Sequence, residues 1–177
     1  MDKEIKQGPE EILEEKLIKV QQRQEWKRFF IECLVLMSAV YVIFHFIIGI
    51  AFVSGHSMEP TLKDGEMVLF YRLDKEYQKN DIVIVKREED VHYIKRIAVC
   101  GGETVSLNET GELVIQGNVQ QGTLATEGGI AFPYEVPEST YFVLGDNRIV
   151  SKDSRMFGAV SQDEIEGRVF LHLGMVW

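Results

Sequence analysis

The stretch FFIECLVLMSAVYVIFHFIIGIAFV, residues 29–53, is the longest apolar run of this chain. It holds one carboxyl group, Glu32, near its start and one histidine, His45, and it lacks the polar face of a helix in a soluble core. As an α-helix, residues 29–53 would measure roughly 37 Å, whereas the hydrocarbon core of a bilayer is about 30 Å thick. We therefore expect a transmembrane helix over residues 29–53.

This helix is expected to be a permanent signal anchor rather than a cleavable signal peptide. The apolar run is too long for a signal peptide, and no small-x-small cleavage site follows it. Cations cluster before the run, whereas Lys63 is the only one within fifteen residues after it. The cations before it are Lys16, Lys19, Arg23, Lys27 and Arg28. The positive-inside rule then predicts a single-pass cell-membrane protein, with residues 1–28 cytoplasmic and residues 54–177 extracytoplasmic.

Beyond Ser54 the pattern changes to short β-rich runs between turn residues, without helical periodicity. Gly and polar residues concentrate between about 104 and 139, which indicates a smaller hairpin-rich β insertion. The predicted fold class is therefore mainly β: one N-terminal transmembrane helix followed by an antiparallel β-sheet domain with this insertion. The predicted strands cover residues 81–86, 91–99, 113–115, 141–144 and 169–173.

The composition excludes some partners. A net charge of −9 without a basic stretch outside the membrane argues against nucleic acid, because phosphate binding requires clustered lysines and arginines. The two cysteines lie in very different settings, Cys33 in the apolar run and Cys100 in a polar-flanked segment. We do not expect a disulfide between them.

Three short stretches hold the residue types that catalysis needs, and each has a simpler explanation. Residues 57–62 read SMEPTL, where Ser57 could serve only as a turn residue. In residues 93–96, YIKR, Lys95 lies on an apolar strand. Burial lowers the pKa of a lysine and makes it a useful base, although an edge strand also carries lysine to prevent aggregation. Residues 145–155, GDNRIVSKDSR, are either a solvated loop or a network of paired acids and arginines.

Taken together, these stretches resemble the bacterial type I signal peptidases, the Ser-Lys leader peptidases, in their Gram-positive-like single-span form. SMEPTL matches the nucleophile box Ser-Met-x-Pro-Thr-Leu of that family, and YIKR matches its lysine box. GDNRIVSKDSR matches the box Gly-Asp-Asn-Arg-x-x-Ser-x-Asp-Ser-Arg at every fixed position. The order of the boxes and the preceding anchor also agree, so the resemblance covers about residues 29–175.

Two positions depart from the family pattern. The family usually has Gly-Leu-Pro-Gly-Asp after the lysine box, where this chain has VCGGE at residues 99–103. A turn glycine and an acid remain, so we expect altered local packing rather than lost activity. Gly55 stands where the Gram-negative branch has a serine of the oxyanion hole. Backbone N–H groups, including that of Ser57, are then expected to stabilise the oxyanion.

The resemblance implies a serine endopeptidase that removes signal peptides from secretory precursor proteins. Cleavage would follow a small residue, in an Ala-x-Ala pattern, through an acyl-enzyme on Ser57 with Lys95 as general base. Neither a metal nor a cofactor is implied, and the partners are the precursor and the lipid bilayer. The resemblance also implies roles for further residues. The lysine would be oriented by Ser151 and Tyr93. The site would be held together by Arg96, Asp146, Asp153 and Arg155, and the substrate pocket would be lined by Met58, Leu62 and Ile94.

Position along the chain gives a separate argument for this substrate. Ser57 lies four residues after the predicted span, so an extended chain would keep it within about 14 Å of the bilayer surface. A precursor whose apolar segment still occupies the bilayer presents its cleavage site at the same height.

The sequence fits other mechanisms and functions less well. A Ser-His-Asp triad is disfavoured because His56 adjoins Ser57, and adjacent side chains of an extended segment point to opposite faces. His92 lies three positions from Lys95 and would reach its face only across a bulge. A catalytically silent family member would be expected to lack the serine or the lysine. A self-cleaving repressor with the same dyad would need a DNA-binding helical domain in place of the span.

Overall fold

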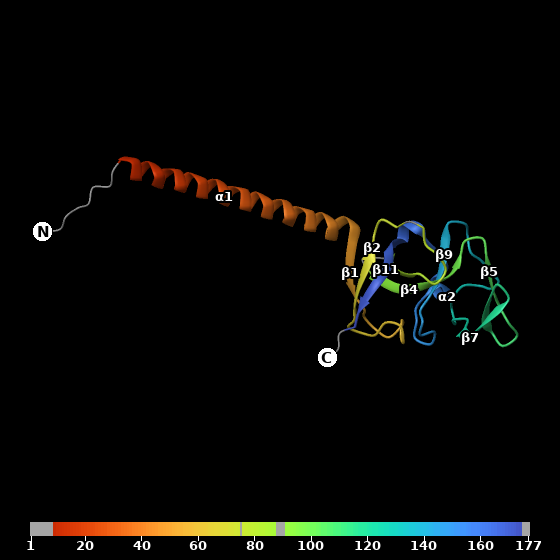
Figure 1. Cartoon of the computed structure of the whole chain (residues 1–177). Coiled ribbons are helices and arrows are strands. Elements are labelled where there is room, and N and C mark those ends of the chain that lie inside the picture. The colour runs from red at the N-terminus through yellow and green to blue at the C-terminus, as the bar shows by residue number, and fades with distance from the viewer. Residues whose placement is uncertain (1–8, 75, 88–90, 175–177) are drawn as a thin grey trace. The chain divides into compact units, whose positions relative to one another are not determined.

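The structure, a computed structural model of the chain, describes residues 9–74, 76–87 and 91–174. Helix α1 spans Pro9–Val42 and continues into a π-helical turn, η1, at Ile43–Ile47 (Figure 1). Within this helical segment Ile18–Ile47 is long and apolar enough to cross a membrane, and none of its most apolar part is buried against protein. Residues 1–8 of the predicted cytoplasmic segment lie outside the described residues.

The end of the predicted helix is wrong, because the last residues of the apolar run form a β-strand. Strand β1 spans Ile48–Phe52 and pairs antiparallel with β2, Met67–Tyr71. Gly49 faces the ring of Phe70 so closely that a Cβ at this position would lie 2.0 Å from the tip of the ring. Glycine is therefore needed at this point of the sheet, whereas it is a poor residue for a helix.

The larger sheet has seven antiparallel strands in the order β1-β2-β11-β3-β4-β9-β10. Its remaining strands are β3 (Ile82–Arg87), β4 (Val91–Cys100), β9 (Thr140–Leu144), β10 (Val160–Ser161) and β11 (Ile165–Leu173). A short helix α2, Ser154–Phe157, and a 3-10 turn η3, Gln162–Glu164, lie between β9 and β11 along the chain. This architecture confirms the predicted mainly β fold with antiparallel sheets and one N-terminal apolar helix.

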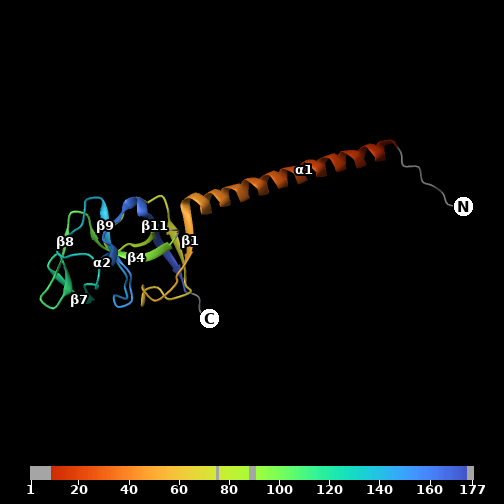
Figure 2. The ribbon, with the colours of Figure 1, turned by 180° about the vertical axis from the view of Figure 1, so that it is seen from behind.

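A second, four-stranded sheet has the order β7-β6-β5-β8 and lies within the stretch where the sequence predicts a β insertion. Its strands are β5 (Thr104–Leu107), β6 (Glu112–Ile115), β7 (Asn118–Leu124) and β8 (Tyr134–Glu135). Figures 1 and 2 show these strands at the end of the β domain away from β1. A buried cluster that includes Val99, Val105, Leu113 and Phe142 joins the two sheets.

Strand β4, which carries the predicted lysine box, lies inside the larger sheet. Its neighbours are β3, where Val83 lies opposite Lys95, and β9, where Leu144 lies opposite Arg96. The β4–β9 register shifts between Ile97 and Val99. A strand paired on both sides has a fixed backbone, so the direction of each side chain along β4 is determined by the sheet.

Candidate active site

The nucleophile box follows β1 as a series of turns that bring Ser57 to the sheet. The amide of Leu62 donates to the carbonyl of Met58 over 3.0 Å, and the amide of Gly55 donates to Asp64 Oδ1 over 2.7 Å. Gly55 has a φ of 87°, a conformation that L side chains rarely adopt. Met58 and Leu62 are 1% and 0% exposed and anchor this segment in the core. Ser57, between them and Gly55, stays partly exposed.

Lys95 meets this serine from the interior of β4. Its side chain is 2% exposed, and its Nζ lies 2.8 Å from Ser57 Oγ and 3.0 Å from the carbonyl oxygen of Ile94. Burial lowers the pKa of Lys95 to about 8, an effect that Asp153 and Asp146 partly oppose. The arrangement therefore places a largely desolvated amine, poised to lose its proton, in hydrogen-bond contact with a serine hydroxyl.

Among the described residues, the hydrogen bonds of Lys95 Nζ do not include the two residues predicted to orient it. Lys95 Nζ lies over the ring of Tyr93, 5.6 Å from its centroid. Ser151 is 8% exposed, and its Oγ has no hydrogen-bond partner among the described residues. Gly145 brings the loop of Ser151 close to the nucleophile, since a Cβ on Gly145 would lie 2.2 Å from Ser151 Oγ and 2.5 Å from the Ser57 carbonyl oxygen. The roles of Tyr93 and Ser151 remain predictions.

Two ion pairs hold the loop that packs on the serine. Arg96 binds Asp146 in a bidentate pair, with Nε to Oδ1 at 2.8 Å and Nη2 to Oδ2 at 2.7 Å. Arg155 binds Asp153 in the same way, at 2.8 and 2.9 Å, and both side chains are buried. The pKa of Asp146 is lowered because its hydrogen bonds to Arg96 and Thr61 outweigh its burial. Charged partners at these distances give short, directional hydrogen bonds.

Further contacts of this loop were not predicted from the sequence. The amide of Asn147 donates to the Ser57 carbonyl oxygen over 3.0 Å. Asp153 Oδ2 accepts from the amide of Gly145 over 3.1 Å, and Arg155 Nη2 donates to the carbonyl oxygen of Arg148 over 2.7 Å. These are backbone contacts, for which residue types in a sequence carry no signal.

The predicted substrate-pocket residues are only partly at the surface. Met58 and Leu62 belong to the core cluster with Val68 and Ile84, while Ile94 is half-buried at its edge. A pocket lined by Met58, Leu62 and Ile94 therefore remains a prediction.

The histidines considered for a triad bind glutamates instead. His56 Nδ1 lies 2.9 Å from Glu59 Oε1, and His92 Nε2 lies 2.9 Å from Glu166 Oε1. Both side chains are exposed, unlike Lys95. The geometry thus pairs Ser57 with the lysine.

Comparison with known proteins adds independent evidence. A signal peptidase I of Bacillus licheniformis is 33% identical over 159 residues, covering 81% of this chain and 84% of that protein. Signal peptidase IB of Staphylococcus aureus is 31% identical over 171 residues, covering 83% of this chain and 88% of that protein. A crystal structure of a signal peptidase I from Enterococcus faecalis superposes with a TM-score of 0.43 at 31% identity, covering 54% of this chain and 97% of the other.

The family described as signal peptidase, peptidase S26, matches residues 24–174, which include all three boxes. This match and the two sequence relatives agree with the family predicted from the boxes. The chain therefore belongs to the signal peptidase family, peptidase S26, and is a serine endopeptidase.

Proposed function

We propose that the chain is a membrane-bound endopeptidase that removes N-terminal signal peptides from secreted precursors, cleaving after a small residue of an Ala-x-Ala pattern. Family membership supports the removal of signal peptides. The observation that carries the mechanism is the 2.8 Å contact between Lys95 Nζ and Ser57 Oγ, made by an amine that is almost fully buried. A buried lysine in contact with a serine is the arrangement that a Ser-Lys acyl transfer requires.

The proposed chemistry begins with neutral Lys95. Its amine takes the proton of Ser57 Oγ as the oxygen attacks the scissile carbonyl, and backbone N–H groups stabilise the oxyanion. The protonated amine then gives its proton to the leaving amine, which releases the mature protein and leaves the signal peptide esterified to Ser57. Water, activated by the same lysine, hydrolyses this ester. A pKa of about 8 supports both directions of transfer, because neither form of the lysine is strongly favoured near neutral pH.

Arg96, Asp146, Asp153 and Arg155 are proposed to act by positioning rather than by contact with substrate. Their ion pairs tie the loop of residues 145–155 to β4 and to itself. The amide of Asn147, in the same loop, holds the Ser57 carbonyl oxygen. A displacement of this loop would therefore move the nucleophile relative to Lys95.

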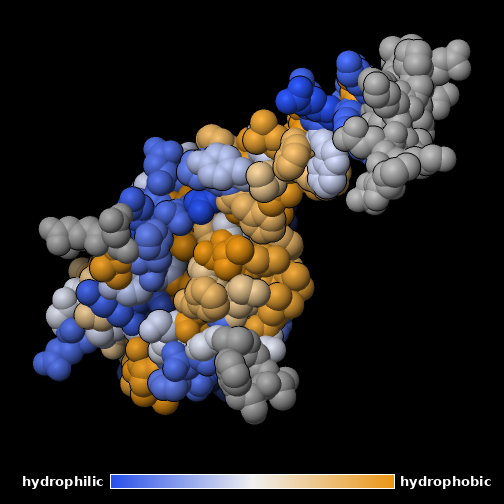
Figure 3. Space-filling view, turned by 90° about the vertical axis from the view of Figure 1, so that its left-hand side faces the viewer, coloured by the Kyte–Doolittle hydropathy of each residue, from blue (hydrophilic) through white to orange (hydrophobic). Residues whose placement is uncertain are grey.

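The bilayer is proposed as the second partner. The apolar segment Ile18–Ile47 supports a single-pass anchor, and the cations before it support a cytoplasmic N-terminus with the β domain outside the cell membrane. Apolar side chains also gather in one region of the surface seen in Figure 3. In the β domain two cross-strand rows share one face of the sheet, Ile50 with Leu69 and Leu171, and Phe52 with Met67 and Leu173. Such a face is suited to contact with lipid.

The expected distance between Ser57 and the bilayer needs correction. Because β1 belongs to the sheet, the helical segment ends at Ile47, ten positions before Ser57. The chain limits the separation to about 35 Å rather than 14 Å. Contact of the apolar sheet face with lipid would then be what keeps the site near the membrane.

A cleavage assay with purified protein in detergent tests the proposal. The substrate is a precursor with an Ala-x-Ala site, and the products are identified by mass. Ser57→Ala is expected to abolish cleavage while the domain stays folded, because the substitution removes only the nucleophilic oxygen. Ser106→Ala, a serine of the smaller sheet, is the matched control and is expected to cleave like the wild type. Turnover by Ser57→Ala near the wild-type rate would contradict the assignment.

A further inference from the structure

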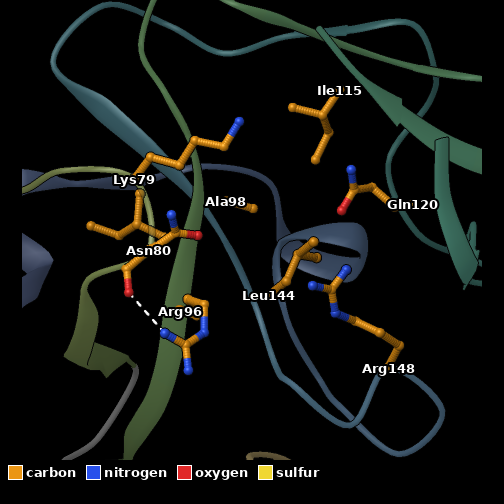
Figure 4. Close-up of a pocket in the computed structure, with 9 residues that line it drawn as sticks. Lys79, Asn80, Arg96, Ala98, Ile115, Gln120, Leu144 and Arg148 are labelled. Atoms are coloured by element: carbon orange, nitrogen blue, oxygen red, sulfur yellow. Dashed lines mark hydrogen bonds between the residues drawn. The ribbon is translucent and has the colours of Figure 1, made fainter. Parts of the chain in front are cut away.

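A cationic cavity lies where residues of the two sheets meet. Its volume is about 60 Å³. The residues that line it are Lys79, Asn80, Arg96, Ile97, Ala98, Ile115, Gln120, Leu144 and Arg148, without a carboxylate among them. Figure 4 shows the amine of Lys79, the amide of Gln120 and the guanidinium of Arg148 converging on the same space.

The cations of this cavity differ in how they are neutralised. Arg96 is occupied by Asp146 and by the carbonyl oxygen of Asn80 at 2.8 Å. Arg148 donates to a neutral group, Thr123 Oγ1, at 3.0 Å, and the ion pairs between described residues do not include it. Burial and the nearby Arg155 lower the pKa of Arg148, an effect that Asp153 and Asp146 partly oppose. Lys79 likewise contacts a neutral group, Gln116 Oε1, at 3.4 Å. An anion bound in the cavity would pair with the positive charges of both Arg148 and Lys79.

An open groove shares Arg148 with this cavity. Arg148 also lines the groove, together with Glu59, Pro60, Gln121, Gly122 and Ile149. Glu59 and Pro60 are two and three positions after Ser57 in the chain. The groove is also lined by Asp146 and by Asn147, whose amide binds the Ser57 carbonyl oxygen. Of the two carboxylates in the groove, Asp146 is paired with Arg96, and Glu59 lies 2.9 Å from His56 Nδ1.

The separation between nucleophile and cavity fits a short peptide. The amide of Asn147 lies 3.0 Å from the Ser57 carbonyl oxygen, and Arg148 is the next residue along the chain. The Cα of Arg148 is about 3.8 Å further on and its side chain reaches roughly 6 Å, so its guanidinium lies within about 15 Å of the Ser57 carbonyl oxygen. An extended chain advances about 3.3 Å per residue, so three to five residues cover this path.

We propose that the groove binds the mature part of the precursor, on the C-terminal side of the scissile bond. In this arrangement Lys79 and Arg148 bind the carboxylate of an aspartate or glutamate at the third to fifth residue after the cleavage point. The inference rests on the proposed function and adds a specificity element to it. It makes an acidic residue at these positions a determinant of how efficiently a precursor is cut.

The test is a glutamate scan in a precursor with a fixed Ala-x-Ala site. Single glutamates replace glutamines at the second to eighth residues after the cleavage point, and kcat/KM is measured for each substrate. We expect a maximum at the third to fifth residues, roughly three- to tenfold above the all-glutamine substrate, as for a partly desolvated charge pair. The maximum should shrink in 0.5 M salt, which screens exposed charges. A flat scan would overturn the inference.

Two variants assign the effect to the cavity. Lys79→Met is expected to lower the ratio between acidic and neutral substrates toward one, whereas Lys86→Met, which removes a surface cation outside the groove, should preserve it. A maximum that survives Lys79→Met would overturn the assignment. Binding of the same peptides to Ser57→Ala gives a readout independent of turnover and should show the same order of affinities. If the wild type cuts none of the substrates, the proposed function fails; if it cuts all of them equally, only this inference fails.

Discussion

Replacement of Asp153 by alanine is expected to cost the domain much of its stability. Asp153 is 0% exposed and Arg155 is 4% exposed, and the two form a bidentate pair at 2.8 and 2.9 Å. Removal of the carboxylate leaves a buried guanidinium without its counter-charge, at a cost of roughly 3–5 kcal/mol. The same substitution removes the acceptor for the Gly145 amide and the N-cap of α2. For a domain of this size the change corresponds to a fall in Tm of about 10–20 °C.

Thermal unfolding and precursor turnover, measured on the same preparation in detergent, test this reasoning. Tm and activity should fall together, because the lost pair holds the loop that packs on Ser57. Glu109→Ala, which removes an exposed carboxylate, should change the unfolding free energy by less than about 0.5 kcal/mol. The double variant Asp153→Leu with Arg155→Met should regain part of the loss, since no unpaired charge then remains buried. Asp153→Ala that keeps the wild-type Tm but is inactive would refute a supporting role and assign a direct catalytic one.

Two other substitutions separate chemistry from stability. Ser151→Ala should lower turnover with little change in Tm, if its Oγ orients the lysine amine during the reaction; unchanged turnover would exclude that role. Lys95→Met should be inactive yet more stable than the wild type at pH 7, by about 2–3 kcal/mol, because the wild-type fold holds a charged amine whose pKa is lowered to about 8. The gain should shrink as pH rises from about 8 to 10.5, where the folded wild type has released the proton and the unfolded chain still holds it. A Tm difference that is constant over this range would contradict the burial argument.

The parts of the fold that follow local rules were predictable. The β-rich runs around Asp81–Lys86 and Val91–Val99 became β3 and β4 within one residue, because alternation and turn residues suffice to define such strands. The sequence predicts helix at Ile48–Phe52 because a strand that is apolar on both faces and the end of a membrane span are both continuous apolar runs. Gly49 is the residue that favours a strand here, but it is required only because the ring of Phe70 packs against it in the folded sheet.

Only those residues of the site that lie in recognisable motifs could be predicted from the sequence. Ser57 and Lys95 are separated by 38 positions, and their contact was expected from the family resemblance rather than from spacing. Met58 and Leu62 were expected at the substrate surface, yet apolar residues beside a nucleophile serve the core equally well, and the structure buries both. The cavity of Lys79 and Arg148 has no sequence signature, because it forms where loops and strands of both sheets meet.

The pH dependence of kcat/KM for the wild type tests the pairing of Ser57 with Lys95 most directly. The base must be neutral to act, and burial lowers the pKa of Lys95 from its ordinary value of 10.5 to about 8. At pH 7 about one tenth of the enzyme then holds the neutral amine, against about one part in 3,000 for an ordinary lysine. The rate should therefore rise about tenfold per pH unit below 8 and level off above it, with the same midpoint in His56→Ala and His92→Ala. A midpoint near 6.5 that disappears in either histidine variant would contradict the account.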